Sequence, residues 1–204
     1  MAPTFSTSRL EAFSDGVIAV IITIMVLELK VPLANGLSGL RAVAPTLAVY
    51  ALSYTFVGIY WINHHLLLAR IEQSTPGILR TNLFWLFCLS LMPFFTAYVL
   101  DKREDTFSVA LYAASLLLTG FSFLLLRVSV NARQRSEDNL EREDTAMQSK
   151  HWISLATYIF AIPLAFFAPV AALCLIGLVN VLWIVPTLGV EHLGKQQVVT
   201  KQPR

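Results

Sequence analysis

The chain has 204 residues, of which 56% are apolar and 14% are charged, and its formal net charge is +2 at pH 7. Soluble globular domains contain about 45–50% apolar and about 25% charged residues. This shift, with a mean hydropathy of +0.64, excludes a disordered protein, argues against an ordinary soluble enzyme and predicts a membrane protein in a lipid bilayer. Because the net charge is weak and no basic run is interleaved with aromatic residues, no nucleic acid partner is expected.

Six apolar segments follow one another along the chain. A hydrocarbon core of about 30 Å requires about 20 helical residues, so most of these segments are long enough to cross it. We therefore predict an all-α bundle of six transmembrane helices, in one domain at 1–189 with a cytoplasmic tail at 190–204. The expected helices lie near residues 10–30, 43–69, 78–100, 107–132, 152–168 and 169–189. The last two share one uncharged stretch, which we expect Pro169 to fold into a hairpin.

The basic residues indicate how these helices are oriented. On the six-crossing arrangement, eleven of the 15 Lys and Arg residues lie on one side, and the other side holds Lys30, Arg41, Lys102 and Arg103. Positive side chains collect in cytoplasmic loops, so we expect a multi-pass protein of the cell membrane with both termini in the cytoplasm. A cleaved signal peptide is the alternative for the first apolar segment, but Asp15 at its edge favours a mature helix.

The sequence predicts neither an enzyme nor a resident cofactor. Cys88 and Cys174 lie in separate apolar segments without the CxxC spacing of metal or redox sites, and we expect both to be buried free thiols. His64 and His65 are adjacent, so their side chains point about 100° apart on a helix and cannot share one metal ion. We therefore expect no structural metal.

The first segment, at 10–30, has two faces that differ in kind. At about 100° per residue, one narrow stripe carries Gly16, Val20, Thr23 and Leu27. The opposite face carries Ser14, Ile18, Ile22 and Met25. Small or modest side chains on the first stripe would let symmetry copies of this helix approach each other around an axis, and such a stripe can line a pore. The alternative is a close-packing seam between neighbouring helices.

Asp15 lies in the same segment and requires a partner, because an acid at membrane depth costs at least about 2.5 kcal/mol unless it is paired or hydrated. The candidate donors in the second and third segments are Trp61, Asn63, His64, His65 and Asn82. We interpret this set as a structural clamp between helices. The functional alternative is a proton-conducting protein that uses Asp15 with His64 and His65, because histidine titrates near neutral pH.

Several of these residues form a recognisable pattern. The first segment opens with Arg-x-x-x-Phe-Ser-Asp, at Arg9, Phe13, Ser14 and Asp15, and continues to Thr-Ile-Met-Val-Leu at 23–27. The second segment carries Trp-x-x-His-His, at Trp61, His64 and His65. With six crossings and the length of one family repeat, the chain resembles the prokaryotic members of the transmembrane protein 175 family, the relatives of the lysosomal potassium channel.

The resemblance implies a homotetramer in which the first helix of each chain lines a central pore, closed at its narrowest point by aliphatic side chains. The implied constriction is Val20, continued by Ile24 and Leu27, although the helical spacing favours Val20 and Leu27 over Ile24. Val20 is shorter than the family's usual Ile or Leu, which predicts a slightly wider neck. Thr23 matches the family's pore threonine, so the permeant ion K⁺ is expected to bind transiently near it. The implied helix-packing network consists of Arg9, Phe13, Ser14, Asp15, Trp61 and His65.

The sequence lacks a Thr-Val-Gly-Tyr-Gly loop of the kind that builds a carbonyl selectivity filter. An apolar ring cannot coordinate a cation, so we expect a hydrophobic gate that closes by dewetting and a potassium-preferring channel of weak selectivity among monovalent cations. A secondary transporter is the alternative, since Pro93 and Pro163 interrupt apolar segments, but the sequence shows no convincing internal repeat.

Overall fold

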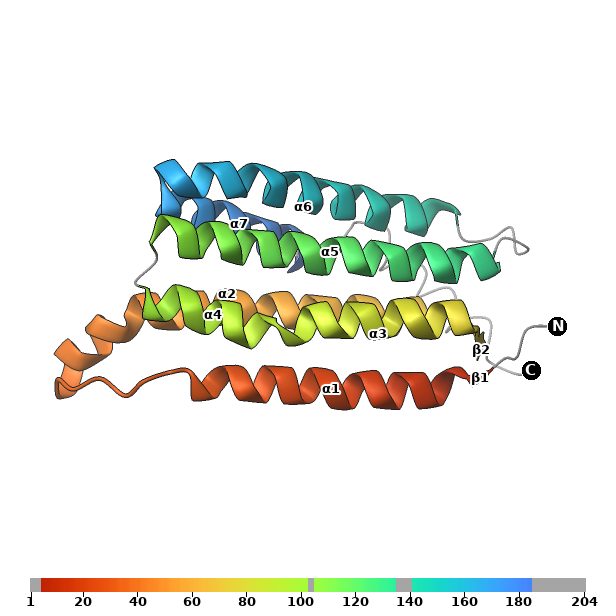
Figure 1. The fold of residues 1–204 in the computed structure, drawn as a ribbon, viewed down its shortest axis with the longest axis horizontal. Coiled ribbons are helices and arrows are strands. Elements are labelled where there is room, and N and C mark those ends of the chain that lie inside the picture. Colours follow the sequence, from red (N-terminus) through yellow and green to blue (C-terminus); the bar gives the residue numbers. More distant parts are fainter. Residues whose placement is uncertain (1–4, 103–104, 135–140, 185–204) are drawn as a thin grey trace, which may run out of the picture.

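The computed structural model describes residues 5–102, 105–134 and 141–184. In this part of the chain, helical segments run side by side along one long axis (Figure 1). The helices are α1 (Thr7–Leu27), α2 (Gly36–Leu68), α3 (Pro76–Ser90), α4 (Met92–Asp101), α5 (Thr106–Gln134), α6 (Glu141–Phe167) and α7 (Pro169–Ile184). Two short strands, β1 (Phe5–Ser6) and β2 (Gln73–Ser74), pair in antiparallel fashion at one end of the bundle.

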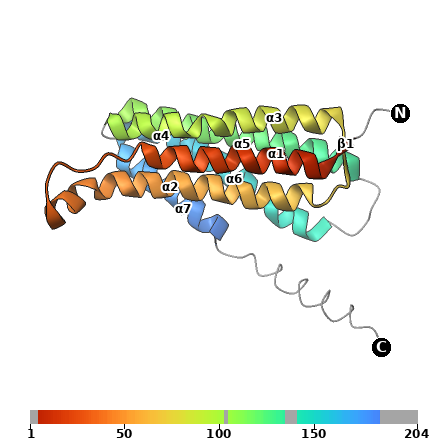
Figure 2. The same cartoon turned by 90° about the horizontal axis from the view of Figure 1, so that it is seen from below.

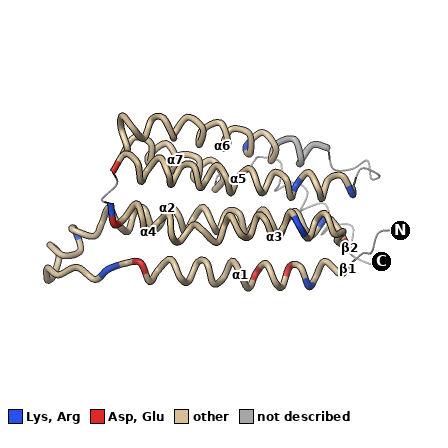
Figure 3. Tube along the Cα trace, viewed as in Figure 1, with Lys and Arg blue, Asp and Glu red and all other residues tan. Residues whose placement is uncertain are grey.

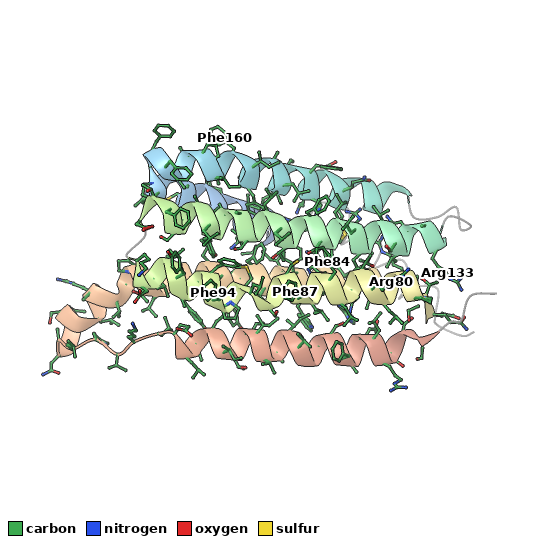
Figure 4. The ribbon with its side chains drawn as sticks, in the orientation of Figure 1. Arg80, Phe84, Phe87, Phe94, Arg133 and Phe160 are labelled. Atoms are coloured by element: carbon green, nitrogen blue, oxygen red, sulfur yellow. The ribbon has the colours of Figure 1, made fainter. Side chains whose placement is uncertain are left out.

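The membrane-spanning, all-α architecture is confirmed. Within the described residues, five spans are long and apolar enough to cross a bilayer, namely Thr7–Leu27, Gly36–Leu68, Pro76–Asp101, Thr106–Arg133 and Met147–Phe167. Charged residues gather toward the two ends of the bundle and leave an uncharged middle (Figure 3). Large apolar side chains such as Phe84, Phe87 and Phe160 are exposed on the surface, as lipid contact requires (Figure 4).

The sixth expected crossing differs from the other five. Helix α7 has 16 residues in the described part of the chain, which corresponds to about 24 Å at about 1.5 Å per residue, less than a hydrocarbon core of about 30 Å. The rest of the expected helix at 169–189, from residue 185 on, and the expected tail at 190–204 lie outside the described residues. Helix α7 turns back from α6 at Pro169, and the two helices pack together.

The third crossing is divided into α3 and α4 at Leu91. Pro93 lacks the N–H group that would bond the carbonyl of Leu89, so the regular helical ladder is interrupted there. Leu91 keeps helical dihedral angles, with φ −81° and ψ −11°, and the N–H of Phe95 bonds its carbonyl at 3.2 Å. The two segments therefore continue each other along the long axis of the bundle and place the break midway beside α1 (Figure 1).

Helix α5 lies at the centre of the bundle and α1 at its edge. The apolar window of α5 is 61% buried, against 28% for that of α1. Helix α1 has its main contacts with α2, α3 and α4. It forms the lower edge of the molecule in Figure 1 and lies in front, between α2 and the α3–α4 pair, in the view from below (Figure 2). Helix α1 is thus left with an uncovered apolar face, and the windows of α2 and α6 are also largely uncovered, at 22% and 33% buried.

The cysteine expectation is half wrong. Cys88 is buried, but Cys174 is exposed. Helix α7 turns Ala172, Ile176 and Val179 toward the core, and Cys174 lies on its other face. An apolar run in a membrane helix does not distinguish a side chain facing the core from one facing lipid.

Candidate functional site

Helix α1 carries apolar side chains on its exposed face as well as on its buried face. Val20, Ile24 and Leu27 form an exposed stripe, with exposed fractions of 54%, 43% and 77%. The face packed against the bundle carries Leu10, Ser14, Ile18, Ile21 and Met25. An uncovered apolar stripe of this kind must contact lipid, a confined channel or another protein chain.

A groove of about 950 Å³ runs along one flank of this stripe, between α1 and the region where α3 meets α4. Its lining includes Phe13, Val20, Ile24 and Glu28 of α1 with Ser90, Pro93, Phe94 and Ala97 of the facing helices. Phe94, which is exposed on α4, belongs to this wall (Figure 4). On this flank α1 and the facing helices thus leave an open space between them, although they remain in contact elsewhere.

Thr23 lies on the exposed face between Val20 and Ile24. Its hydroxyl group donates to the backbone carbonyls of Ala19 and Val20, each at 3.0 Å. Because the single hydroxyl proton is committed to the helix backbone, the oxygen lone pairs are available on the outward side. Thr23 therefore offers an electron-rich oxygen beside the apolar stripe, which is the group that a partly dehydrated cation requires.

A chain of buried hydrogen bonds, the Ser14–Asn82–His64 chain, ties the inner face of α1 to α3 and α2. The amide nitrogen of Asn82 donates to the Ser14 hydroxyl at 2.9 Å, and His64 Nε2 lies 2.8 Å from the amide oxygen of Asn82. The Ser14 hydroxyl in turn donates to the carbonyl of Leu10 at 2.8 Å. Because the amide nitrogen of Asn82 donates to Ser14, the Asn82 atom that faces His64 is the amide oxygen, which can only accept a hydrogen bond. His64 Nε2 therefore carries a proton and donates a hydrogen bond to this oxygen.

Asp15 is held by a second, separate contact. The indole N–H of Trp61 donates to Asp15 Oδ1 at 2.9 Å, and the Trp61 ring stacks on His65 with ring centres 6.4 Å apart. Asp15 itself is exposed. In the described part of the chain, no hydrogen bond joins Asp15 to His64, so the two groups belong to different sets of contacts.

The remaining candidates of the packing network lie apart from these contacts. Arg9 and Phe13 are on the exposed face of α1, and the amide nitrogen of Asn63 donates to the carbonyl of Ile59 in its own helix at 2.8 Å. The start of α1 is fixed instead by the β1–β2 pair, in which Phe5 lies opposite Ser74. The first turns of α1 are thus attached to both α2 and α3, whereas its exposed stripe is not attached to either.

A further buried polar cluster was not anticipated from the sequence. Thr96 donates to the Ser53 hydroxyl at 2.8 Å, and the Ser53 hydroxyl lies 2.8 Å from the hydroxyl of Tyr112. These residues connect α4, α2 and α5 in the buried interior of the bundle. Their only signal in the sequence is a hydroxyl side chain inside each of three apolar segments, and such side chains also bond within their own helix.

The family described as "Endosomal/lysosomal potassium channel TMEM175" matches residues 9–93, which include nearly all of α1 and the whole of α2 and α3. The chain is 38% identical over 188 residues to a potassium channel of Chryseobacterium sp. (strain P1-3), an alignment that covers 92% of this chain and 97% of that one. It is 33% identical over 128 residues to a potassium channel of Streptomyces collinus, with 59% of this chain and 62% of the relative covered.

A solved structure has a similar fold. The crystal structure of a lysosomal potassium-selective channel TMEM175 homolog from Chamaesiphon minutus matches with a TM-score of 0.74. The match covers 87% of this chain and 96% of that chain at 23% sequence identity. At this identity the likeness concerns the arrangement of the helices, and it extends over nearly all of the described bundle.

Proposed function

Since the chain belongs to the TMEM175 family, a family of ion channels and not of enzymes, we propose that it is a potassium-preferring cation channel. In this proposal four copies of the chain surround a central pore, and α1 of each copy lines it. The observation that carries the proposal is the exposed apolar stripe of Val20, Ile24 and Leu27 on a helix that the rest of the bundle leaves half uncovered. A single chain places only one such helix at the axis, so the pore requires several copies.

The gate follows from the chemistry of this stripe. Rings of Val20, Ile24 and Leu27 would present only hydrocarbon to the ion path, and hydrocarbon cannot replace the hydration shell of a cation. A narrow apolar neck empties of water and stops conduction, whereas a slightly wider one fills and lets a partly hydrated ion pass. We assign the constriction to these three residues, with Val20 first.

Selectivity in this proposal comes from Thr23. Its outward oxygen lone pairs would form a ring just beyond Val20 and replace part of the water around a passing ion. Potassium is held less strongly by its hydration water than sodium, so it loses less in this exchange. A ring of hydroxyl groups without a surrounding carbonyl filter predicts preference for potassium, with sodium still permeant.

Replacing Thr23 by alanine is expected to lower the potassium-to-sodium permeability ratio while conduction persists. The expected reduction is roughly threefold, or about 0.7 kcal/mol, the scale of one modest hydrogen-bond-type interaction. Thr23→Ser, which keeps the hydroxyl, is the matched control and should retain most of the preference. Reversal potentials in mixed potassium and sodium solutions measure the ratio, and an unchanged ratio in Thr23→Ala would remove Thr23 from this role.

The membrane orientation is also part of the proposal. We propose that the end of the bundle that carries Arg80 and Arg133 (Figure 4), together with Arg9 at the start of α1 and Arg70 after the end of α2, faces the cytoplasm, in line with the distribution of positive charge, and that the protein resides in the cell membrane. The end that carries Lys30 and Lys102 then faces outward. Labelling of single cysteines introduced at Glu72 and at Leu33 with a membrane-impermeant reagent tests this arrangement.

Ion flux from purified protein in liposomes tests the function as a whole. We expect potassium flux that follows the imposed gradient without a coupled ion and that exceeds sodium flux. Flux that requires a second ion would instead support a secondary transporter, and proton flux without potassium flux would support conduction through Asp15 with His64 and His65. Either result, or the absence of any cation flux, would overturn the proposal.

A further inference from the structure

Glu28 lies at the junction of two cavities at the end of α1. It is the C-terminal capping residue of the helix, and its backbone N–H bonds the carbonyl of Met25 at 3.4 Å. Its side chain lines the groove that contains Val20 and Ile24, and it also lines a second cavity of about 730 Å³ that contains Lys30 and Asp101. Glu28 is thus the charged residue that α1 places directly beyond its exposed stripe.

The other charges around the second cavity are already paired. Lys30 Nζ lies 3.7 Å from Asp101 Oδ1, and Lys102 Nζ lies 3.3 Å from Asp101 Oδ2. Asp101 therefore holds both ammonium groups toward the end of α4. Glu28 is exposed, and among the described residues its carboxylate takes part in no ion pair or hydrogen bond. Its charge is consequently open to mobile ions from solution.

The helix itself adds to this charge. The C-terminal end of an α-helix carries roughly half a negative elementary charge, because its last carbonyl groups are unpaired. Glu28 stands at that end of α1, so the two negative charges act in the same direction. In the groove that contains Val20 and Ile24, Glu28 is the one charged residue among the described lining residues, and a cleft lined by one sign of charge between low-dielectric walls concentrates counter-ions.

We propose that Glu28 draws cations to the outer mouth of the pore and sets the rate at which they enter from that side. This inference rests on the proposed function, because it requires α1 to line a pore. Four carboxylates and four helix ends would then surround the mouth beyond Leu27. Glu28 acts on conductance, whereas Thr23 acts on the choice between potassium and sodium.

The salt dependence of the current tests this role. In about 0.01 M potassium chloride the Debye length is about 30 Å, so the Glu28 charges act across the mouth of the pore. In about 1 M potassium chloride the Debye length is about 3 Å, so the same charges are screened. Glu28→Gln is expected to reduce the current of potassium entering from the outer side roughly threefold at the lower concentration. The difference from the unsubstituted channel should vanish at the higher concentration. Glu28→Asp, which keeps the charge, should retain the current.

Glu72→Gln is the matched control, because it removes the same charge from an exposed position between α2 and β2, outside both cavities. It should leave the outer-side current unchanged. Equal currents for Glu28→Gln and the unsubstituted channel in dilute salt would overturn the inference while the proposed channel stands. An equal loss in Glu72→Gln would also overturn it, and absence of potassium current from the unsubstituted protein would overturn both proposals.

Discussion

Replacing Val20 by alanine is expected to raise potassium conductance roughly tenfold, because it lowers the free energy needed to fill the apolar neck with water. Each substitution removes hydrocarbon equivalent to two CH₂ groups, and each CH₂ corresponds to about 0.8 kcal/mol of contact with water. Over four chains this contact free energy adds up to about 6 kcal/mol. A tenfold change in conductance corresponds to about 1.4 kcal/mol, so even a quarter of the total is enough to produce it. Single-channel or liposome currents at fixed voltage measure the change.

A control on the same helix separates this effect from a general loosening of α1. Val26 is also exposed, with a fraction of 45%, but it lies on the other flank from the groove, away from Val20 and Ile24. Val26→Ala removes the same hydrocarbon and should leave conductance within about twofold of the original. Val20→Phe should instead reduce the current, since it fills the neck. Conductance that is the same in Val20→Ala and the unsubstituted channel would remove Val20 from the gate.

The sequence indicated the faces of α1 well, for a physical reason. In a helix of fixed period, the separation of Val20 and Leu27 from Ser14 and Met25 follows from spacing alone. The sequence also limited the partner of Asp15 to a few residues. A carboxylate inside an apolar segment must meet a hydrogen-bond donor, and the second and third segments contain few donors. The observed contact with Trp61 comes from that short set. Which donor meets it depends on helix packing, which spacing does not define.

Other features depend on packing alone and could not be read from the pattern. The cluster of Ser53, Thr96 and Tyr112 forms because three helices meet, and no local signal distinguishes it from hydroxyl groups that bond their own helix. The start of α6 at Glu141 precedes the expected 152, because charged residues extend a helix into water as readily as they form a loop. Hydropathy marks where apolar spans lie, and helices continue past them.

Replacing Asn82 by leucine is expected to destabilise the folded protein by about 2–3 kcal/mol. The change leaves the buried His64 N–H without an acceptor, which costs about 1–3 kcal/mol. The Ser14 hydroxyl loses the bond from Asn82 but keeps its bond to the Leu10 carbonyl, so this loss adds about 0.5–1.5 kcal/mol. Hydrogen bonds between side chains of neighbouring membrane helices contribute about 0.6 kcal/mol on average. We therefore expect the total loss of stability to lie toward the lower end of the sum of these two costs. Denaturation of the detergent-solubilised protein, followed by tryptophan fluorescence, measures the loss.

The matched control is Asn63→Leu, because Asn63 is partly buried and bonds only within its own helix through Ile59. Its loss should cost less than about 1 kcal/mol, the typical net contribution of one hydrogen bond.

A second comparison isolates the contact between α2 and α3. If His64 and Asn82 act as a pair, the double substitution His64→Phe with Asn82→Leu should lower the free energy of unfolding by less than the sum of the two single substitutions. The reason is that the double substitution removes both partners and leaves no unpaired polar group facing hydrocarbon between them. Additive losses would show that the two side chains are stabilised independently of each other.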